Sequence, residues 1–268
     1  MTNINEDDMS ITNSDISIDS NDLENWNPSF PSYTYNEKPP FLRKKSIKPF
    51  SMILCASRNQ GKSYMIRYLY ENHWEKKFDL VMVFSKTLGS GFYDQFIKSK
   101  TKYSSFSPEI LQKLFALQEE HKKKTSSYLN ILCVFDDCLG SNIMYNQEVQ
   151  DVFTLGRHLG LSVVFATQNP TCVSQTCRQN TTHLVLLRCK GRGLDNILNN
   201  FLLDLIDEDE LPDHCKRVDV FLRSIIKKVF SIRYRALVID YDREGTTFSD
   251  CAKTFMVPEI WKPKRRSD

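Results

Sequence analysis

The segment 56–63, ASRNQGKS, ends in Gly-Lys-Ser and constrains the fold more than any other stretch of the chain. It follows the apolar run SMILC and precedes SYMIRYLYENHW, in which apolar residues recur at helical spacing. A buried strand, a loop and a helix in this order are typical of the phosphate-binding pattern G-x-x-x-x-G-K-[ST]. Ala56 stands where the first glycine is expected, and alanine is tolerated there if its φ is negative. We therefore predict a nucleotide-binding loop.

The chemistry of such a loop assigns a task to each of its last residues. Backbone N–H groups at a helix N-terminus favour the negative charge of a phosphate. Gly61 would let the backbone approach the phosphate, Lys62 would reach the β/γ oxygens, and the Ser63 hydroxyl would bind Mg²⁺. The predicted nucleotide-binding residues are Ala56, Ser57, Arg58, Asn59, Gln60, Gly61, Lys62, Ser63 and Tyr64.

Two further apolar runs end in polar residues that complete such a site. The run ILCVFDD ends in Asp136, which we expect to hold Mg²⁺ through water, and in Asp137, which we expect to orient the attacking water. The next run, SVVFATQ, ends in Gln168. Because parallel strands end at one edge of a sheet, Gln168 should lie near the γ-phosphate beside the two aspartates.

Strands and helices alternate along the chain, which predicts an α/β fold with a mostly parallel sheet and helices on both faces. Gly160 is expected to stop the helix that precedes the fourth strand. The other predicted strands are 78–85, 128–138, 161–169, 182–188 and 234–242, the last one in the chain, and the predicted helices are 107–124, 146–160, 193–210 and 213–229.

Charge divides the chain into a core and two tails. Residues 1–37 carry eight of the 33 acidic residues and no Lys or Arg, whereas the remainder carries all 36 basic residues against 25 acidic ones. We predict a flexible acidic tail at 1–45, one ATPase domain at 46–258 and a basic tail at 259–268. A basic body suits a polyanionic partner such as nucleic acid.

The cysteines and the apolar runs indicate the compartment. Eight cysteines occur without any C-x-x-C, as is typical of small buried hydrophobic residues in a reducing environment. The acidic start excludes a signal peptide, and no apolar run approaches the length of a membrane span. We expect an intracellular protein that is not an integral membrane protein.

Four segments together resemble the genome-packaging ATPases of large DNA viruses, in the poxvirus-type branch of the FtsK/HerA translocases. They are ASRNQGKS, ILCVFDD, GRHLGLSVVFATQ and CRQNTTHLVLL, within roughly Phe50 to Leu187. The resemblance implies a RecA-like additional-strand P-loop core, ATP and Mg²⁺ as cofactors, a homo-oligomeric ring of five or six subunits, and double-stranded DNA as cargo. It further implies viral capsid or membrane-vertex proteins as partners, and a location in the viral factory of the host cytoplasm and in the virion.

The resemblance also assigns catalytic roles. Asp136 maps to the metal position, Asp137 to the catalytic acid and Gln168 to a phosphate sensor. A ring ATPase needs a positive group from the neighbouring subunit at the γ-phosphate. Arg157 and Arg178 are the candidates, and Arg157 is preferred because it precedes the fourth strand and is expected near the edge of the nucleotide site.

Two other functions share parts of this pattern. A small-molecule kinase would have the same loop and parallel sheet, but it would add an Arg-rich lid and would not need GRHLGLSVVFATQ. A non-motor assembly protein would use ATP only to organise a ring, and the set of Lys62, two aspartates and Gln168 argues against it.

Overall fold

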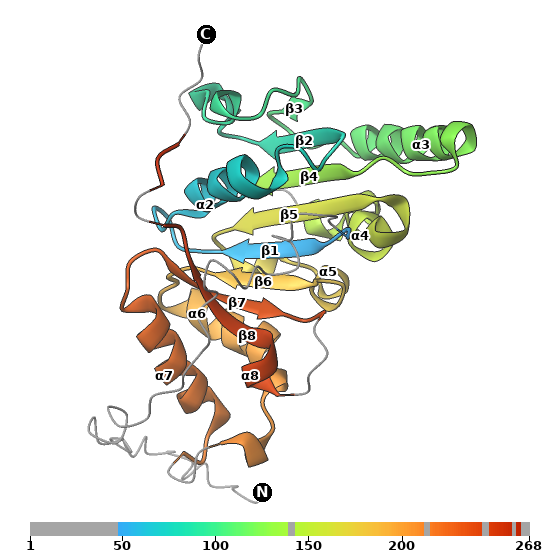
Figure 1. Cartoon of the computed structure of the whole chain (residues 1–268). Coiled ribbons are helices and arrows are strands. Elements are labelled where there is room, and N and C mark those ends of the chain that lie inside the picture. The colour runs from blue at the N-terminus through green and yellow to red at the C-terminus, as the bar shows by residue number, and fades with distance from the viewer. Residues whose placement is uncertain (1–47, 139–142, 212–214, 243–246, 259–260, 264–268) are drawn as a thin grey trace, which may run out of the picture.

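A single eight-stranded sheet has the order β3-β2-β4-β5-β1-β6-β7-β8 in the computed structural model of the chain (Figure 1). The structure describes residues 48–138, 143–211, 215–242, 247–258 and 261–263. Neighbouring strands from β3 to β6 are parallel, and β7 runs antiparallel to both β6 and β8. The strands are β1 (Ser51–Cys55), β2 (Leu80–Ser85), β3 (Lys102–Tyr103), β4 (Ile131–Asp136), β5 (Leu161–Thr167), β6 (His183–Leu186), β7 (Arg235–Asp240) and β8 (Ala252–Met256).

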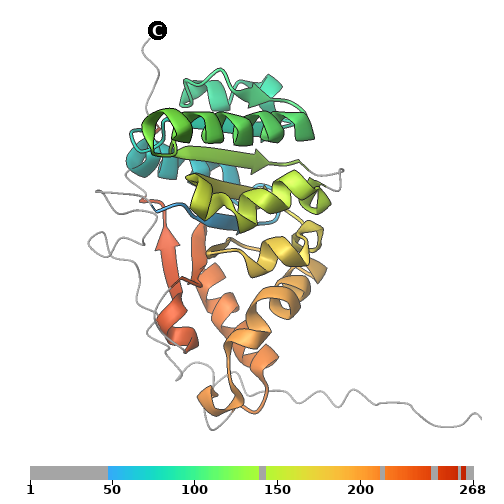
Figure 2. The same cartoon turned by 90° about the vertical axis from the view of Figure 1, so that its right-hand side faces the viewer.

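Helices cover both faces of the sheet, so its central strands are buried on both sides. One face packs against α3 to α7, and the other packs against α2 and the segment that follows β2 (Figures 1 and 2). The helices are α2 (Lys62–Leu69), α3 (Pro108–Thr125), α4 (Gln147–Thr154), α5 (Gln175–Gln179), α6 (Arg192–Ile197), α7 (Val218–Phe230) and α8 (Phe248–Cys251). Within the described part of the chain, no helix is long and apolar enough to span a bilayer.

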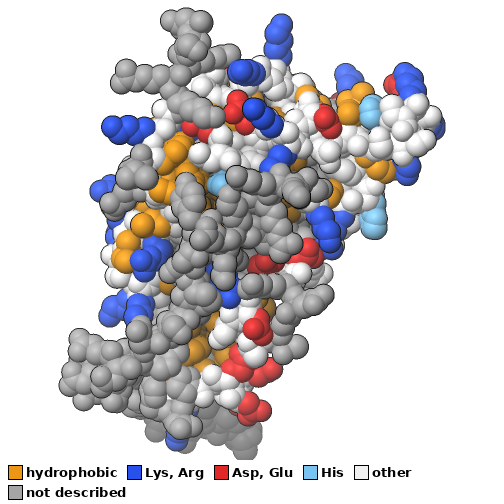
Figure 3. Space-filling view, in the orientation of Figure 1, with side chains coloured by type: hydrophobic (Ala, Val, Ile, Leu, Met, Phe, Trp, Pro, Cys, Tyr) orange, Lys and Arg blue, Asp and Glu red, His pale blue; other side chains and the backbone are white. Residues whose placement is uncertain are grey.

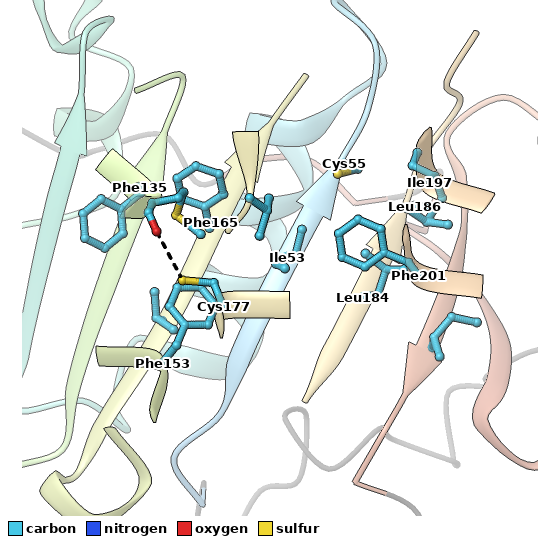
Figure 4. Close-up of a cluster of buried hydrophobic side chains, with 14 of the residues drawn as sticks. Ile53, Cys55, Phe135, Phe153, Phe165, Cys177, Leu184, Leu186, Ile197 and Phe201 are labelled. Carbon is cyan, nitrogen blue, oxygen red and sulfur yellow. Dashed lines mark hydrogen bonds between the residues drawn. The ribbon is translucent and has the colours of Figure 1, made fainter. Parts of the chain in front are cut away.

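Alternation along β1 divides the core into two clusters. Ile53 and Cys55 point into the cluster under α4, α5 and α6, where Phe165 and Phe201 pack (Figure 4). Met52 and Leu54 point to the opposite face, against α2. Because side chains alternate across a strand, five consecutive buried residues serve both faces at once.

The predicted parallel α/β fold is confirmed, but several elements differ from the prediction. The predicted helix 146–160 ends at Thr154 and is followed by the 3₁₀ turn Gly156–Leu159, and α5 was not predicted. The strand at 234–242 is not the last, because the short segment Ala252–Met256 adds β8 beyond it. The two-residue strand β3 was also not predicted. The predicted helix 193–210 is broken after α6 into a π-helical turn, Leu198–Leu202, and two 3₁₀ turns.

The predicted tails and cysteines can be compared with the structure only in part. The acidic tail 1–45 lies outside the described residues, as does the basic tail except for 261–263, so the domain boundaries stay predictions. The cysteines are free; five are buried, and Cys172, Cys215 and Cys251 are partly exposed.

The position of β5 determines how the candidate residues meet. This strand separates the loop strand β1 from the acidic strand β4, which is the additional-strand arrangement that was predicted. Cys55 pairs with Thr167, and Asp136 pairs with Ala166. The three strands therefore end at nearly the same level, at the left-hand edge of the sheet in Figure 1.

The turn before β5 requires a glycine at position 160, and this requirement can be tested. Gly160 ends the 3₁₀ turn Gly156–Leu159 with a φ of 68°, and a Cβ atom there would lie 2.4 Å from the Leu129 carbonyl oxygen. We expect Gly160→Ala to lower the free energy of unfolding by roughly 2 kcal/mol or more, because it adds left-handed backbone strain to a clash. Urea denaturation measures the change. Gly89→Ala is the control, since nothing lies within 4 Å of its Cβ, and equal losses in both variants would contradict the prediction.

Candidate nucleotide-binding site

The loop leaves β1 at the edge where the parallel strands end. The Ala56 N–H donates to the Thr167 carbonyl (3.2 Å), and the Ser57 N–H donates to the Arg188 carbonyl (3.1 Å), which fixes the start of the loop to the ends of β5 and β6. Ala56 is fully buried and is not among the residues with positive φ, so the condition set for alanine at this position is met. Asn59 and Gly61 have positive φ angles of 61° and 91°, and they turn the chain into α2.

Gly61 is required by its surroundings as well as by its backbone. A Cβ atom on Gly61 would lie 3.1 Å from the ring of Tyr234, which precedes β7. The antiparallel direction of β7 brings this turn to the edge of the loop. The Arg233 guanidinium lies 4.7 Å from the centroid of the Tyr234 ring. No local pattern in the sequence indicates this contact, because it joins segments more than 170 residues apart.

The N-terminus of α2 suits an anion. Gly61 caps the helix without a side-chain hydrogen bond, and the first turn holds no acidic residue. The first N–H groups of a helix have no partner within the helix and carry partial positive charge. Lys62 is the first residue of α2, and its side chain is buried (7 % exposed). The loop can therefore surround a phosphate with backbone donors and one ammonium group.

Asp136 ends β4 and is buried beneath the loop (1 % exposed). Its Oδ2 accepts hydrogen bonds from the Ser63 hydroxyl (3.1 Å) and from the Tyr93 hydroxyl (2.7 Å). Burial raises the pKa of Asp136, and the hydrogen bond from Tyr93 opposes that rise. Its other oxygen, Oδ1, is buried and has no hydrogen-bond partner within the described part of the chain. Sequence reasoning missed Tyr93, which comes from a short turn with no recognisable pattern.

Asp137, Lys62 and Gln168 come together as predicted. Asp137 leaves the strand in the left-handed region (φ 51°). Its Oδ1 lies 3.8 Å from the Lys62 Nζ and accepts a hydrogen bond from the Gln168 Nε2 (3.0 Å). Because β5 separates β1 from β4, Gln168 is the polar group that reaches across to Asp137. The site therefore holds a carboxylate that contacts both a cation and an amide.

The residues at this site fit Mg²⁺ only together with phosphate oxygens. Within the described ranges, no group of three or more His, Cys, Asp or Glu side chains could hold a metal ion. The Ser63 hydroxyl and the unpaired, buried Oδ1 of Asp136 offer oxygen ligands at one place. Mg²⁺ commonly uses one or two protein ligands and completes its shell with water and substrate phosphates.

The structure corrects the expected position of Arg157. It precedes β5, whereas Gln168 follows it, so the seven residues of the strand place the two at opposite edges of the sheet, about 20 Å apart. Arg157 Nη2 instead lies 3.3 Å from Asp242 Oδ1. Arg178 donates to the Val173 carbonyl (2.7 Å) and does not contact the loop in its own chain, as far as the described residues extend.

Basic side chains lie around the loop. Lys and Arg residues lie along the left-hand edge in Figure 3, where the parallel strands end, and Asp and Glu residues lie elsewhere on the same face. Exposed basic residues at this edge include Arg58 in the loop, Lys190 after β6 and Arg233 before β7. This edge therefore presents positive charge to an anionic ligand.

Comparison with known proteins identifies the family. The family model described as poxvirus A32 protein matches residues 40–209, which include the loop, both aspartates and Gln168. The chain belongs to this family. The poxvirus-type resemblance of the four sequence segments is thereby confirmed.

Curated relatives of this A32-family chain come from two viruses. The chain is 27 % identical over 139 residues to protein 015R of Frog virus 3 (isolate Goorha), covering 51 % of the chain and 43 % of that protein. It is 26 % identical over 157 residues to protein L437 of Acanthamoeba polyphaga mimivirus, covering 55 % of each. The chain thus spans about half the length of these curated relatives.

Solved structures confirm the fold. The genome packaging NTPase B204 from Sulfolobus turreted icosahedral virus 2, in complex with sulfate, matches with a TM-score of 0.55 and 14 % identity. The match covers 79 % of this chain and 98 % of B204. The B204 complex with ATP-gammaS matches with a TM-score of 0.50 over 77 % of this chain and 96 % of B204. The A32-family chain therefore has the P-loop fold of this packaging NTPase.

The two aspartates are expected to respond differently to removal of their charge. A carboxyl with a raised pKa destabilises the folded chain at neutral pH, so Asp136→Asn should raise the melting temperature of the nucleotide-free protein. Asp137→Asn should not, because Asp137 is partly exposed and lies beside Lys62. Thermal unfolding at pH 7 compares the two variants. A lower melting temperature for Asp136→Asn than for Asp137→Asn would contradict this account of the buried acid.

Proposed function

We propose that this chain is an ATP hydrolase that moves double-stranded DNA during packaging of a viral genome. The observation that carries the proposal is the convergence of Lys62, Asp137 and Gln168, beside Ser63 and Asp136, at the ends of three strands. Membership of the A32 family and a fold shared with a genome packaging NTPase support it. The solved complex of B204 with ATP-gammaS supports ATP as the nucleotide.

The chemistry follows from the positions of these side chains. Backbone N–H groups of the loop and Lys62 would hold the β/γ-phosphates, and Ser63 and Asp136 would hold the metal. Bound Mg²⁺ neutralises charge on the phosphate oxygens. Lys62 exchanges its contact with Asp137 for phosphate oxygens, which leaves the Asp137 carboxylate to orient and deprotonate the attacking water. Gln168 keeps Asp137 in place and is close enough to sense the γ-phosphate.

The motor itself is a homo-oligomeric ring of five or six subunits in this proposal. A ring would bring a positive group from a neighbouring subunit to the γ-phosphate. This is needed for Arg157 and Arg178 to act there, because both lie away from the loop of their own chain. The excess of basic residues beyond residue 37 supports DNA as the polyanionic cargo. Capsid or membrane-vertex proteins would anchor the ring, in the viral factory of the host cytoplasm and in the virion.

ATP turnover with and without DNA tests the proposal. We expect wild-type protein to hydrolyse ATP with Mg²⁺ and to do so faster with double-stranded DNA. Lys62→Ala should lose about 100-fold or more in turnover. The substitution removes the buried ammonium group that is expected to contact the phosphates. Lys113→Ala, on the exposed side of α3, is the control. DNA-independent turnover with phosphorylation of a small molecule would favour a kinase, and binding without turnover would favour an assembly protein.

Mixed rings test the proposed arginine. Arg157→Ala subunits should bind ATP normally and lose on the order of 10³-fold in turnover, and mixing with Lys62→Ala subunits should restore part of it. Some interfaces of a mixed ring join an intact loop to an intact arginine. Asp242→Asn is the control, because it removes the same ion pair but keeps Arg157. If Arg157→Ala keeps full ATP turnover, the role falls to Arg178. If mixed rings form but do not recover ATP turnover, the result contradicts a site shared between subunits.

A further inference from the structure

Tyr93 is a buried hydroxyl that the reaction described above does not use. It opens the 3₁₀ turn Tyr93–Gln95, in the connection between β2 and β3, and is 1 % exposed. Its hydroxyl donates to Asp136 Oδ2 at 2.7 Å, which is shorter than the bond from Ser63 (3.1 Å). A hydrogen bond from a neutral hydroxyl to a buried carboxylate is a strong one. Tyr93 is therefore the closer of the two groups that hold this carboxylate.

Arg67 of α2 connects this helix to the turn that carries Tyr93. Arg67, which is 6 % exposed, donates from Nη1 to Gln95 Oε1 (2.6 Å) and from Nε to Glu71 Oε1 (2.8 Å). Its guanidinium also lies 5.3 Å from the centroid of the Phe96 ring. The helix that begins with the phosphate loop thus holds the turn next to Asp136.

Aromatic packing fixes the ring of Tyr93 itself. The centroid of its ring lies 5.3 Å from that of Phe92 and 5.5 Å from that of Phe96. The Phe92 contact is edge-to-face, which aromatic pairs favour, and the Phe96 contact is tilted. They depend on the ring and not on the hydroxyl, so a phenylalanine at position 93 would keep them.

The two hydroxyl donors leave the Asp136 carboxylate with one oxygen for a ligand. Oδ2 accepts from both Tyr93 and Ser63, whereas Oδ1 is buried and has no hydrogen-bond partner among the residues that the structure describes. A buried oxygen without a partner is costly unless a ligand satisfies it. We propose that Tyr93 is a positioning residue for Mg²⁺ binding. Its hydroxyl holds the Asp136 carboxylate so that Oδ1 faces the metal and its water shell. This inference rests on the Mg²⁺-ATP site of the proposed function.

A purely structural role for Tyr93 predicts a different experimental result. A hydroxyl that only satisfies a buried acid would change the stability of the fold, and nucleotide binding would change equally with and without the metal. A positioning role changes the metal requirement alone, because the loop and Lys62 bind the phosphates without Tyr93. The dependence of binding on Mg²⁺ concentration therefore separates the two roles.

The experiment measures binding of a fluorescent ATP analogue to Tyr93→Phe over a range of Mg²⁺ concentrations and in EDTA. We expect the affinity of Tyr93→Phe for the analogue in EDTA to equal that of the wild type. The Mg²⁺ concentration that gives half of the Mg²⁺-dependent increase in binding should be roughly 10- to 100-fold higher, because removing a partner of a metal ligand usually weakens metal affinity by this factor. Tyr70→Phe is the matched control, since Tyr70 packs on the same Phe96 ring (5.7 Å) and is also buried. An unchanged Mg²⁺ requirement for Tyr93→Phe would overturn the inference, as would equal losses in EDTA and in Mg²⁺.

A second variant keeps the test decisive if Tyr93→Phe does not fold. Gln95→Ala leaves Tyr93 and Asp136 intact but removes the acceptor that ties the turn to Arg67. It should raise the Mg²⁺ requirement in the same direction by a smaller factor, and no change would count against the role of the turn. If wild-type protein showed no Mg²⁺-dependent binding, the proposed function would fail together with this inference. If wild type binds and Tyr93→Phe matches it, only the inference fails.

Discussion

The register of three parallel strands is the constraint on which the site depends. β4, β5 and β1 pair residue by residue, with Asp136 beside Ala166 and Cys55 beside Thr167. The residues that directly follow β4, β5 and β1 therefore lie at the same height along the strand direction. The phosphate loop, Asp136, Asp137 and Gln168 are neighbours for this reason. A slip of one residue in any of these ladders would turn the side chains of that strand to the opposite face. The buried ladder thus fixes distances in the site more firmly than the loops themselves.

The reversed strand β7 has a separate influence on the same edge. Its start lies where the parallel strands end, so the Tyr234 ring rests against Gly61. β8 then returns to this edge, and Trp261 packs on α2 through Tyr64 and Tyr68, with ring centroids 4.8 and 5.1 Å apart. The helix of the phosphate loop is therefore held from the C-terminal part of the chain as well as by the sheet. This explains why one face of α2 is fully buried although the helix is short.

Local pattern in the sequence predicted the parts of the site that are themselves local. The loop, Asp136, Asp137 and Gln168 were found because each is a polar group directly after an apolar run, and the strand order then confirmed that they meet. Tyr93 and Tyr234 were missed because their importance lies in contacts across the fold that leave no periodicity. Arg157 was placed at the wrong edge, since nearness to a strand in sequence does not say which end of the strand is meant. β8 was missed because a short strand with Lys and Thr lacks an apolar run.

The central position of β1 has a consequence for how the chain is made. β1 leaves the ribosome before its neighbours β5 and β6, and contacts such as those of Phe50 with Ser162 and Ser51 with Thr182 span 112 and 131 residues. Until those later strands are synthesised, the apolar segment SMILC has two unpaired edges and no phosphate loop can form beside it. Closing so long a loop is slow, and an unpaired apolar strand is prone to aggregate meanwhile. A nascent chain of this protein therefore exposes an apolar strand while the next 131 residues are made, and assistance from chaperones matters most during that interval.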